Sequence, residues 1–270
     1  MIKLILPLRS LAAACLGFAL SFAAQGLSQS GQSQLDIAPS VERLLSIEGE
    51  ALNPKSGAVV YREFHFCDKQ SISCQVKYED SNGTPIIEKE LDFSSNAIAP
   101  DFEQLDLRTG RFIASEQQGD YTLFSVSQSR LVETYVEGQI VKPDDAKNRT
   151  LLTPSQLVID AGFDNFIRQQ WDGLVTGDKT EFEFALPSRG TAIPMQIKPS
   201  SDVQCQRLTA GQNARCFQLQ PKSALFRVFL KPIQLAYDKE SRKLLAFKGL
   251  SSIKDSSDNA QVVLIRYRYP

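Results

Sequence analysis

The sequence contains one histidine, His65, which limits the nucleophilic chemistry open to the chain. A serine or cysteine nucleophile is ordinarily activated by a histidine base, so a site of that type must include His65. The residue lies in a β-rich run, where alternation places it on one face with Glu63 and Cys67. The sequence motifs of serine hydrolases, zinc metalloproteases and P-loop proteins do not occur. We therefore expect a strand histidine without a catalytic role, in a protein that is not an enzyme.

Two pairs of carboxylates are spaced to share one face of a strand: Glu181 with Glu183, and Asp101 with Glu103. Paired carboxyl groups facing a cleft can hydrolyse glycosidic bonds, so a hydrolase of envelope polymers is one alternative. Such pairs on alternating strands are more often solvated edges, and that is the expectation here. The other acidic runs lack the spacing of a calcium loop, so we predict no metal site and no cofactor.

Four cysteines follow the N-terminal region: Cys67, Cys74, Cys205 and Cys216. An even number at two short spacings is typical of disulfides formed in an oxidising compartment. Four cysteines allow three connectivities. The pairing of Cys67 with Cys74 and of Cys205 with Cys216 is the most economical, because each bond closes a loop of hairpin size. A zinc site made by all four is the rival interpretation, but the spacings do not match zinc knuckles.

The first 26 residues have the parts of a secretory signal peptide. Lys3 and Arg9 form a basic start, and residues 11–24 form an apolar run too short to span a bilayer comfortably. Cys15 raises the alternative of a lipoprotein, although the apolar run continues past it. An uncleaved anchor is a further alternative. We predict an exported protein of the bacterial periplasm or cell envelope.

Composition separates the remaining chain into a spacer and a domain. Residues 27–40 are rich in Ser, Gln and Gly and predict a disordered spacer. Residues 41–270 predict a single β-rich domain, in which no stretch approaches the length of a transmembrane helix. The net charge is −1, and no basic run of the nucleic-acid-binding type occurs, so nucleic acid is not an expected partner.

One stretch stands out as helical among segments that otherwise predict short strands. A single apolar stripe with the period of an α-helix is formed by Phe163, Phe166, Ile167, Trp171 and Leu174. It predicts one long helix near residues 160–176, with a bend near Asp160 because Gly162 follows. A capping-box pattern that begins at Thr153 predicts an additional helical turn there.

Turn signals divide the rest of the domain into ten or more strands, and their short connections predict antiparallel pairing. Residues 203–209 are predicted as a strand and residues 221–230 as a short helix. The fold class is therefore α+β, mostly β: a large curved antiparallel sheet, a barrel or half-barrel, packed on the long helix near residues 160–176.

Three sequence blocks resemble an uncharacterised family of exported bacterial envelope proteins. They are LVIDAGFDNFIR from Leu157, FALPSR from Phe184, and LLAFKGLSSIKD from Leu244. The resemblance covers most of residues 50–270 and supplies no activity. In layout alone, the chain is similar to half-barrel proteins of the lipoprotein-carrier type, which enclose an apolar cavity in a curved sheet covered by helices. The order of the elements differs.

Aromatic residues of the helix and of nearby segments are candidates for an apolar ligand site: Phe163, Phe166, Trp171, Phe184, Phe226 and Phe229. The alternative interpretation is core packing. A lipid or other apolar ligand between helix and sheet would make this a non-catalytic binding protein, peripheral to a membrane. Basic residues near the short helix would suit an anionic lipid head group or, equally, a solvated face: Lys222, Arg227 and Lys231. A structural or scaffolding envelope protein without a small ligand is the main alternative.

Overall fold

The computed structural model describes residues 42–270 apart from residues 129–134, 137–138, 210–212, 230 and 256. The predicted signal peptide and the whole of the predicted spacer, with Cys15, lie outside the described residues. Within the described part of the chain, no helix is long and apolar enough to cross a membrane.

Strands make up most of the described chain. In chain order the elements are β1 (Leu44–Leu52), β2 (Val59–Cys67), β3 (Ser73–Asp80), β4 (Pro85–Asp92), β5 (Asp101–Asp106), β6 (Arg111–Gln118), β7 (Tyr121–Ser127), β8 (Tyr135–Val136), β9 (Gln139–Ile140), β10 (Lys147–Leu152), β11 (Leu157–Val158), α1 (Gly162–Gln169), α2 (Trp171–Thr176), β12 (Thr180–Leu186), the 3₁₀ helix η2 (Pro187–Arg189), β13 (Thr191–Pro199), α3 (Asp202–Thr209), β14 (Ala214–Pro221), α4 (Ala224–Phe229), β15 (Ile233–Asp238), β16 (Leu244–Leu250) and β17 (Val262–Arg268).

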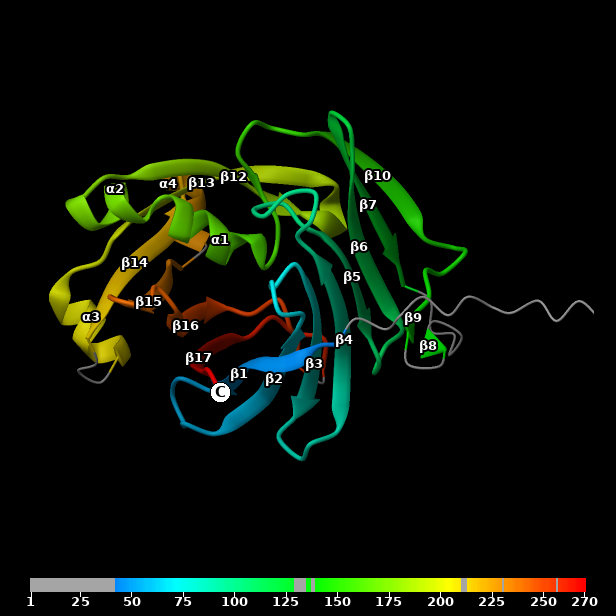
Figure 1. The fold of residues 1–270 in the computed structure, drawn as a ribbon, viewed down its shortest axis with the longest axis horizontal. Helices are drawn as coiled ribbons and strands as arrows, with labels where there is room; N and C mark the ends of the chain where they lie inside the picture. The colour runs from blue at the N-terminus through cyan, green and yellow to red at the C-terminus, as the bar shows by residue number, and fades with distance from the viewer. Residues whose placement is uncertain (1–41, 129–134, 137–138, 210–212, 230, 256) are drawn as a thin grey trace, which may run out of the picture. The chain divides into compact units, whose positions relative to one another are not determined.

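Fifteen of the described strands form one sheet, in the order β10-β7-β6-β5-β4-β3-β2-β1-β17-β16-β15-β14-β13-β12-β11. Neighbours pair antiparallel, as predicted, except for the short parallel contact between β11 and β12. The first and last strands, β1 and β17, pair in the middle of the sheet and join two meanders, β1 to β7 and β12 to β17. Figure 1 shows the green strands on one side and the orange strands on the other, joined through the blue and red strands.

A short link between the two edges forces this sheet to curve. β10 and β11 lie at opposite edges, yet only residues 153–156 separate them. From the end of β10 to the start of β11 the chain can span at most about 17 Å. A flat sheet with fourteen strand spacings would hold its edges about 67 Å apart. The sheet therefore curls until its edges approach each other, but it does not close, because β10 does not pair with β11.

The turn after β12 bridges the open seam. Residues of η2 contact β6 and β7 on the other side of the seam. The guanidinium of Arg149 on β10 donates to the carbonyl oxygen of Arg189 at 3.3 Å. Gly190 adopts a φ of 62°, and a Cβ on it would lie 2.6 Å from the Cβ of Arg149. Only glycine satisfies both the conformation and the close approach.

Two main apolar cores fill the inside of the curve. The first lies among β1–β5, β17 and the segment before α1, and includes Val76, Phe102, Leu157, Ile159 and Ile265. The second lies between β12–β15 and the helices α1 and α2, and includes Phe166, Trp171, Phe182, Phe217 and Tyr237. The apolar stripe of the sequence thus packs on the second meander.

The predicted long helix is instead two short helices, α1 and α2, with Gln170 between them at φ −91° and ψ 5°. The N–H of Gln170 still donates to the carbonyl of Phe166 at 3.0 Å. The interruption is therefore a local change of direction. It sets Trp171, the first residue of α2, against the rings of Phe217 and Tyr237. The predicted bend near Asp160 is confirmed, because this residue has a φ of 45° directly before α1.

Two further local predictions were wrong. The capping-box pattern at Thr153 starts no helix, since residues 153–156 form the link between the sheet edges. Residues 203–209 form the helix α3 rather than a strand. The bond from Cys205 to Cys216 holds this segment on β14, where Leu208 is buried against the sheet. The short helix predicted within residues 221–230 is confirmed as α4.

Gly162 is the first residue of α1, and its replacement tests how closely this helix approaches the loop before β5. A Cβ would lie 2.1 Å from the carbonyl oxygen of Ile98, which also accepts the N–H of Ile159 at 3.0 Å. We predict that Gly162→Ala lowers the free energy of unfolding by about 1–3 kcal/mol, measured by urea denaturation.

The matched control for this substitution is Gly173→Ala in α2. There a Cβ meets only the flexible carboxylate of Asp178, at 3.1 Å. Alanine should stabilise this helix by up to about 1 kcal/mol. Equal effects of the two substitutions would contradict the close backbone contact at Gly162.

Candidate functional site

Polar side chains gather on the inner face of the first meander, beginning with β2. Strand alternation puts Glu63 and His65 on the same buried face as Tyr61 and Cys67. Nε2 of His65 lies 3.3 Å from Oε1 of Glu63, so the ring nitrogen donates to the carboxylate when it carries a proton. The predicted shared face of Glu63, His65 and Cys67 is confirmed.

An ion pair lies further along this face, in which Lys89 is buried and the side chain of Asp160 is 23 % exposed. The ammonium of Lys89 on β4 is 2.8 and 3.0 Å from the two carboxylate oxygens of Asp160. Lys89 is only 3 % exposed, and its Nζ lies 5.9 Å from the ring of Tyr78 and 5.8 Å from that of Phe102. Asp160 has the positive φ that aspartate and asparagine tolerate better than most residues, and it also accepts the N–H of Ala161. The pair ties the segment before α1 to β4.

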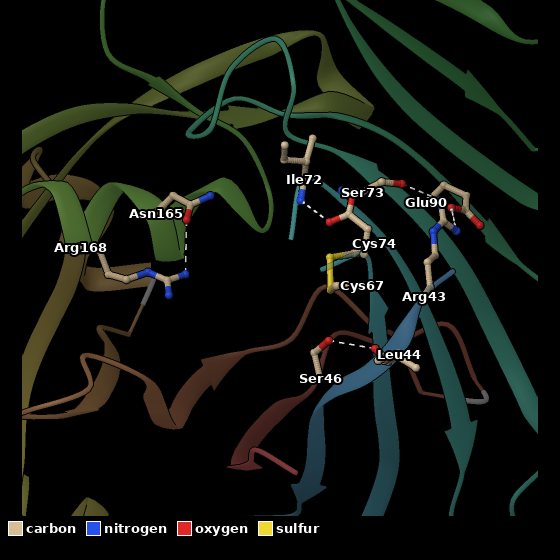
Figure 2. Close-up of a disulfide and its surroundings, with 11 residues drawn as sticks. Arg43, Leu44, Ser46, Cys67, Ile72, Ser73, Cys74, Glu90, Asn165 and Arg168 are labelled. Carbon is tan, nitrogen blue, oxygen red and sulfur yellow. Dashed lines mark hydrogen bonds and ion pairs between the residues drawn. A yellow bond between two sulfur atoms is a disulfide. The ribbon is translucent and has the colours of Figure 1, made fainter. Parts of the chain in front are cut away.

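Helix α1 adds a second, partly exposed ion pair, in which the side chains of Arg168 and Asp164 are 43 % and 26 % exposed. Asp164 and Arg168 lie one turn apart and pair with each other. Asn165 accepts from Arg168 and donates to the carbonyl of Ala97 at 2.8 Å. Burial raises the pKa of Asp164, and the guanidinium of Arg168 opposes that shift. Figure 2 shows Asn165 and Arg168 together on α1 in the surroundings of the disulfide between β2 and β3.

Five tyrosines surround these carboxylates: Tyr61, Tyr78, Tyr237, Tyr267 and Tyr269. Burial is the largest cause that raises the pKa of each. The charge of Glu63 adds to the rise for Tyr61, Tyr78 and Tyr267, and that of Asp164 for Tyr237 and Tyr269. The phenols therefore remain hydrogen-bond donors, as where Tyr269 donates to the carbonyl of Leu244 at 2.9 Å.

This polar cluster, partly buried and partly exposed, joins elements of the fold. Lys89 with Asp160 joins β4 to the segment before α1, and the side chains of α1 extend the cluster towards β2. We interpret these paired charges as fixing the positions of the elements that carry them. The sequence interpretation missed the cluster except for Glu63 and His65. Its one local signal was a lysine between Ile87 and Leu91 on the apolar face of a strand.

The disulfides form in the most economical of the predicted pairings. Cys67 and Cys74 lie directly opposite each other on β2 and β3, as Figure 2 shows. Cys205 on α3 is bonded to Cys216 on β14. The bonds leave none of these four thiols for a nucleophile or a zinc ion.

Two of the candidate ligand residues lie in the second core. Phe166 and Trp171 are 1 % and 5 % exposed. The ring of Phe166 lies 4.7 Å from that of Phe182, and the ring of Trp171 lies 5.5 Å from Phe217 and 5.9 Å from Tyr237. These are the separations of packed aromatic side chains.

The other four candidates are not brought into one space with them. Phe163 and Phe184 are partly buried against the second core. Phe226 is 54 % exposed on α4. The side chain of Phe229 lies outside the described residues. A ligand role for this set stays a prediction.

The carboxylate pair on β12 borders a surface cavity of about 200 Å³, which Lys222 and the link at residues 154–156 also line. Oε2 of Glu181 lies 2.5 Å from Nζ of Lys222, and both side chains are 54 % exposed. A glycosidase acid needs a site that favours its neutral form, usually an apolar one. The solvated pair of Glu181 with Lys222 provides no such surroundings.

The pair on β5 lies among other carboxylates. Burial raises the pKa of Asp101, and the N–H of Gln117 opposes that rise by donating to its carboxylate at 2.7 Å. Burial also raises the pKa of Glu103, and Glu90, directly opposite on β4, adds to it. A hydrolytic role for this pair stays untested.

Comparison with known proteins adds little to this geometry. No protein-family model and no curated protein matches the chain. Among solved structures, the chain is similar to a β-barrel-like protein of a domain of unknown function, DUF1849, from Brucella abortus. The TM-score is 0.45 at 6 % identity, covering 84 % of this chain and 99 % of that one. A similarity this weak supplies neither an activity nor a test of the sequence blocks.

Asp160→Asn tests the buried ion pair, because it removes the charge of the carboxylate but keeps its shape and its tolerance of positive φ. Lys89 would then be buried without an anionic partner. We predict a loss of about 3–5 kcal/mol in the free energy of unfolding, measured by urea denaturation. The control is Glu181→Gln, which breaks the exposed pair with Lys222 and should cost less than about 1 kcal/mol. Similar losses in both variants would contradict the anchoring role of Lys89.

Alkaline titration tests the buried tyrosines. Their pKa is raised in the folded chain, so the unfolded chain releases these protons first, near pH 10. Their contribution to stability is complete below about pH 10 and falls as the pH rises further. We predict that most tyrosinate absorbance appears in the same cooperative transition as the loss of circular dichroism. Gradual ionisation of most tyrosines within an intact fold would contradict this expectation.

Proposed function

We propose that this chain is a non-catalytic, exported envelope protein that acts as a scaffold through its surface. The observation that carries the proposal is the packing of the apolar stripe. Four of its residues are 5 % exposed or less: Phe166, Ile167, Trp171 and Leu174. The space between helices and sheet that could have held a ligand is occupied by these side chains. This favours a scaffold over a carrier of a small apolar ligand.

The size of the described cavity beside β12 agrees with that choice. It measures about 200 Å³ and is lined by Phe182 and Met195 of the second core, but by no residue of the stripe. Pockets for small molecules usually occupy about 300–1,000 Å³. A carrier of the half-barrel type would need its apolar space inside the curve.

The compartment and the lack of catalysis rest on separate observations. The two disulfides fit an oxidising, exported environment. The bonded cysteines and the paired interior charges support a structural use of these residues. We place the protein in the periplasm or the cell envelope as part of this proposal.

Stability measurements separate a packed stripe from a pocket wall. Trp171→Ala should lower the free energy of unfolding by about 3–5 kcal/mol, because it empties a packed position of the second core. Phe226→Ala, at an exposed position of α4, should change it by less than about 0.5 kcal/mol. Urea denaturation measures both. A small loss for Trp171→Ala would indicate that this ring lines an open space.

Native mass spectrometry addresses the ligand directly. Protein purified from its own envelope under mild conditions should show the mass of the polypeptide with no retained small molecule. A lipid or other apolar molecule retained at one per chain would overturn the proposal in favour of a carrier. Chemical cross-linking before purification should capture a protein partner of the scaffold.

A further inference from the structure

Helix α4 presents two adjacent large apolar side chains to solvent. It follows the end of β14, and Leu225 and Phe226 are 68 % and 54 % exposed. Single exposed apolar residues are ordinary, but two neighbouring ones that are both more than half exposed point to a contact surface. The apolar stripe of α1 and α2 is buried by contrast, although those helices are also short.

Basic residues flank this pair on both sides. Lys222 precedes α4, Arg227 lies within it, and Lys231 follows it. Nε of Arg227 donates to the carbonyl of Pro221 at 3.0 Å, and its Nη2 donates to the carbonyl of Lys222 at 2.6 Å. Both acceptors are uncharged, so these bonds hold the guanidinium at the base of α4 without neutralising it. Lys222 forms an ion pair with Glu181.

We propose that α4 docks the protein on an anionic lipid surface. Leu225 and Phe226 enter the boundary between head groups and acyl chains, while Arg227 and Lys231 face the lipid phosphates. This inference rests on the proposed function and names the surface that the scaffold contacts. An exposed apolar pair bordered by cations fits a peripheral, reversible membrane anchor.

A lipid surface suits this patch better than a second copy of the chain. A stable protein interface buries about 1,200–2,000 Å² in total, far more than two side chains on a six-residue helix provide. Binding to a lipid surface requires no shape complementarity. Its anionic head groups attract the cationic side chains wherever these lie around the helix. The positive charges of Arg227 and Lys231 therefore favour an anionic lipid surface as the partner.

Flotation of the full chain with vesicles tests the proposal. The protein should float with vesicles of phosphatidylcholine and phosphatidylglycerol, bind phosphatidylcholine alone more weakly, and detach as salt is raised. The double substitution Leu225→Ser and Phe226→Ser should weaken binding by about 10-fold or more. Lys231→Gln should weaken binding to anionic vesicles only.

The matched control is Leu44→Ser, since Leu44 on β1 is 66 % exposed and three strands separate β1 from β14, the strand before α4. It should leave vesicle binding unchanged. Any contribution of residues 1–41 is common to every variant and cancels in the comparison. Absence of binding to anionic vesicles, or equal binding by the wild type and the double variant, overturns the proposal. A dimer that depends on Phe226, without vesicle binding, also overturns it in favour of a second copy.

These outcomes are independent of the test of the proposed function. Trp171→Ala reports on the second core, which includes none of the described side chains of α4. A lipid detected by native mass spectrometry counts as a core ligand only if the double variant of α4 also retains it. Failure of vesicle binding would leave a scaffold with another contact surface. A retained ligand in the core would end the scaffold proposal whatever α4 does.

Discussion

The pairing of β1 with β17 is the constraint on which the rest of the structure depends. It joins the two ends of the domain in the middle of the sheet, so the middle of the chain must supply both edges. Glu48 lies opposite Arg268, and Glu50 lies between Arg266 and Arg62 in the register of the three central strands. A slip of one residue would turn these charges inward, so they help to specify the pairing. Because residues 153–156 must then connect the edges, the sheet has to curl.

Because the sheet curves, the segment that follows the link between its edges enters the interior and must be fixed there. The segment before α1 is held by the pair of Lys89 with Asp160 and by the contact of Gly162 with Ile98. A buried ion pair stabilises a fold no better than apolar packing does, but its geometry is more demanding. We interpret the pair as fixing where the chain returns, while the second core supplies the apolar burial.

Helices α1 and α2 bury their apolar stripe, whereas α4 leaves apolar side chains exposed, and this difference leads to the proposed function. α1 and α2 follow the link between the edges and are drawn inside the curve, where their apolar stripe becomes core. α4 follows the end of β14 and leaves Leu225 and Phe226 in solvent. Side chains thus fill the contact between these helices and the sheet, and a small apolar surface is exposed on α4.

The sequence by itself determined the features that depend on neighbouring residues. Short spacings indicated the bonds of Cys67 with Cys74 and of Cys205 with Cys216, short turns indicated antiparallel pairing, and the glycine after Asp160 indicated a bend. Only the tertiary structure decided that Trp171 is core, that residues 203–209 are a helix, and that Lys89 meets Asp160, 71 residues away. Periodicity reports which side of an element is apolar, because it reflects local backbone geometry. What that side meets depends on the strand order and the curl, which arise from pairings between distant parts of the chain.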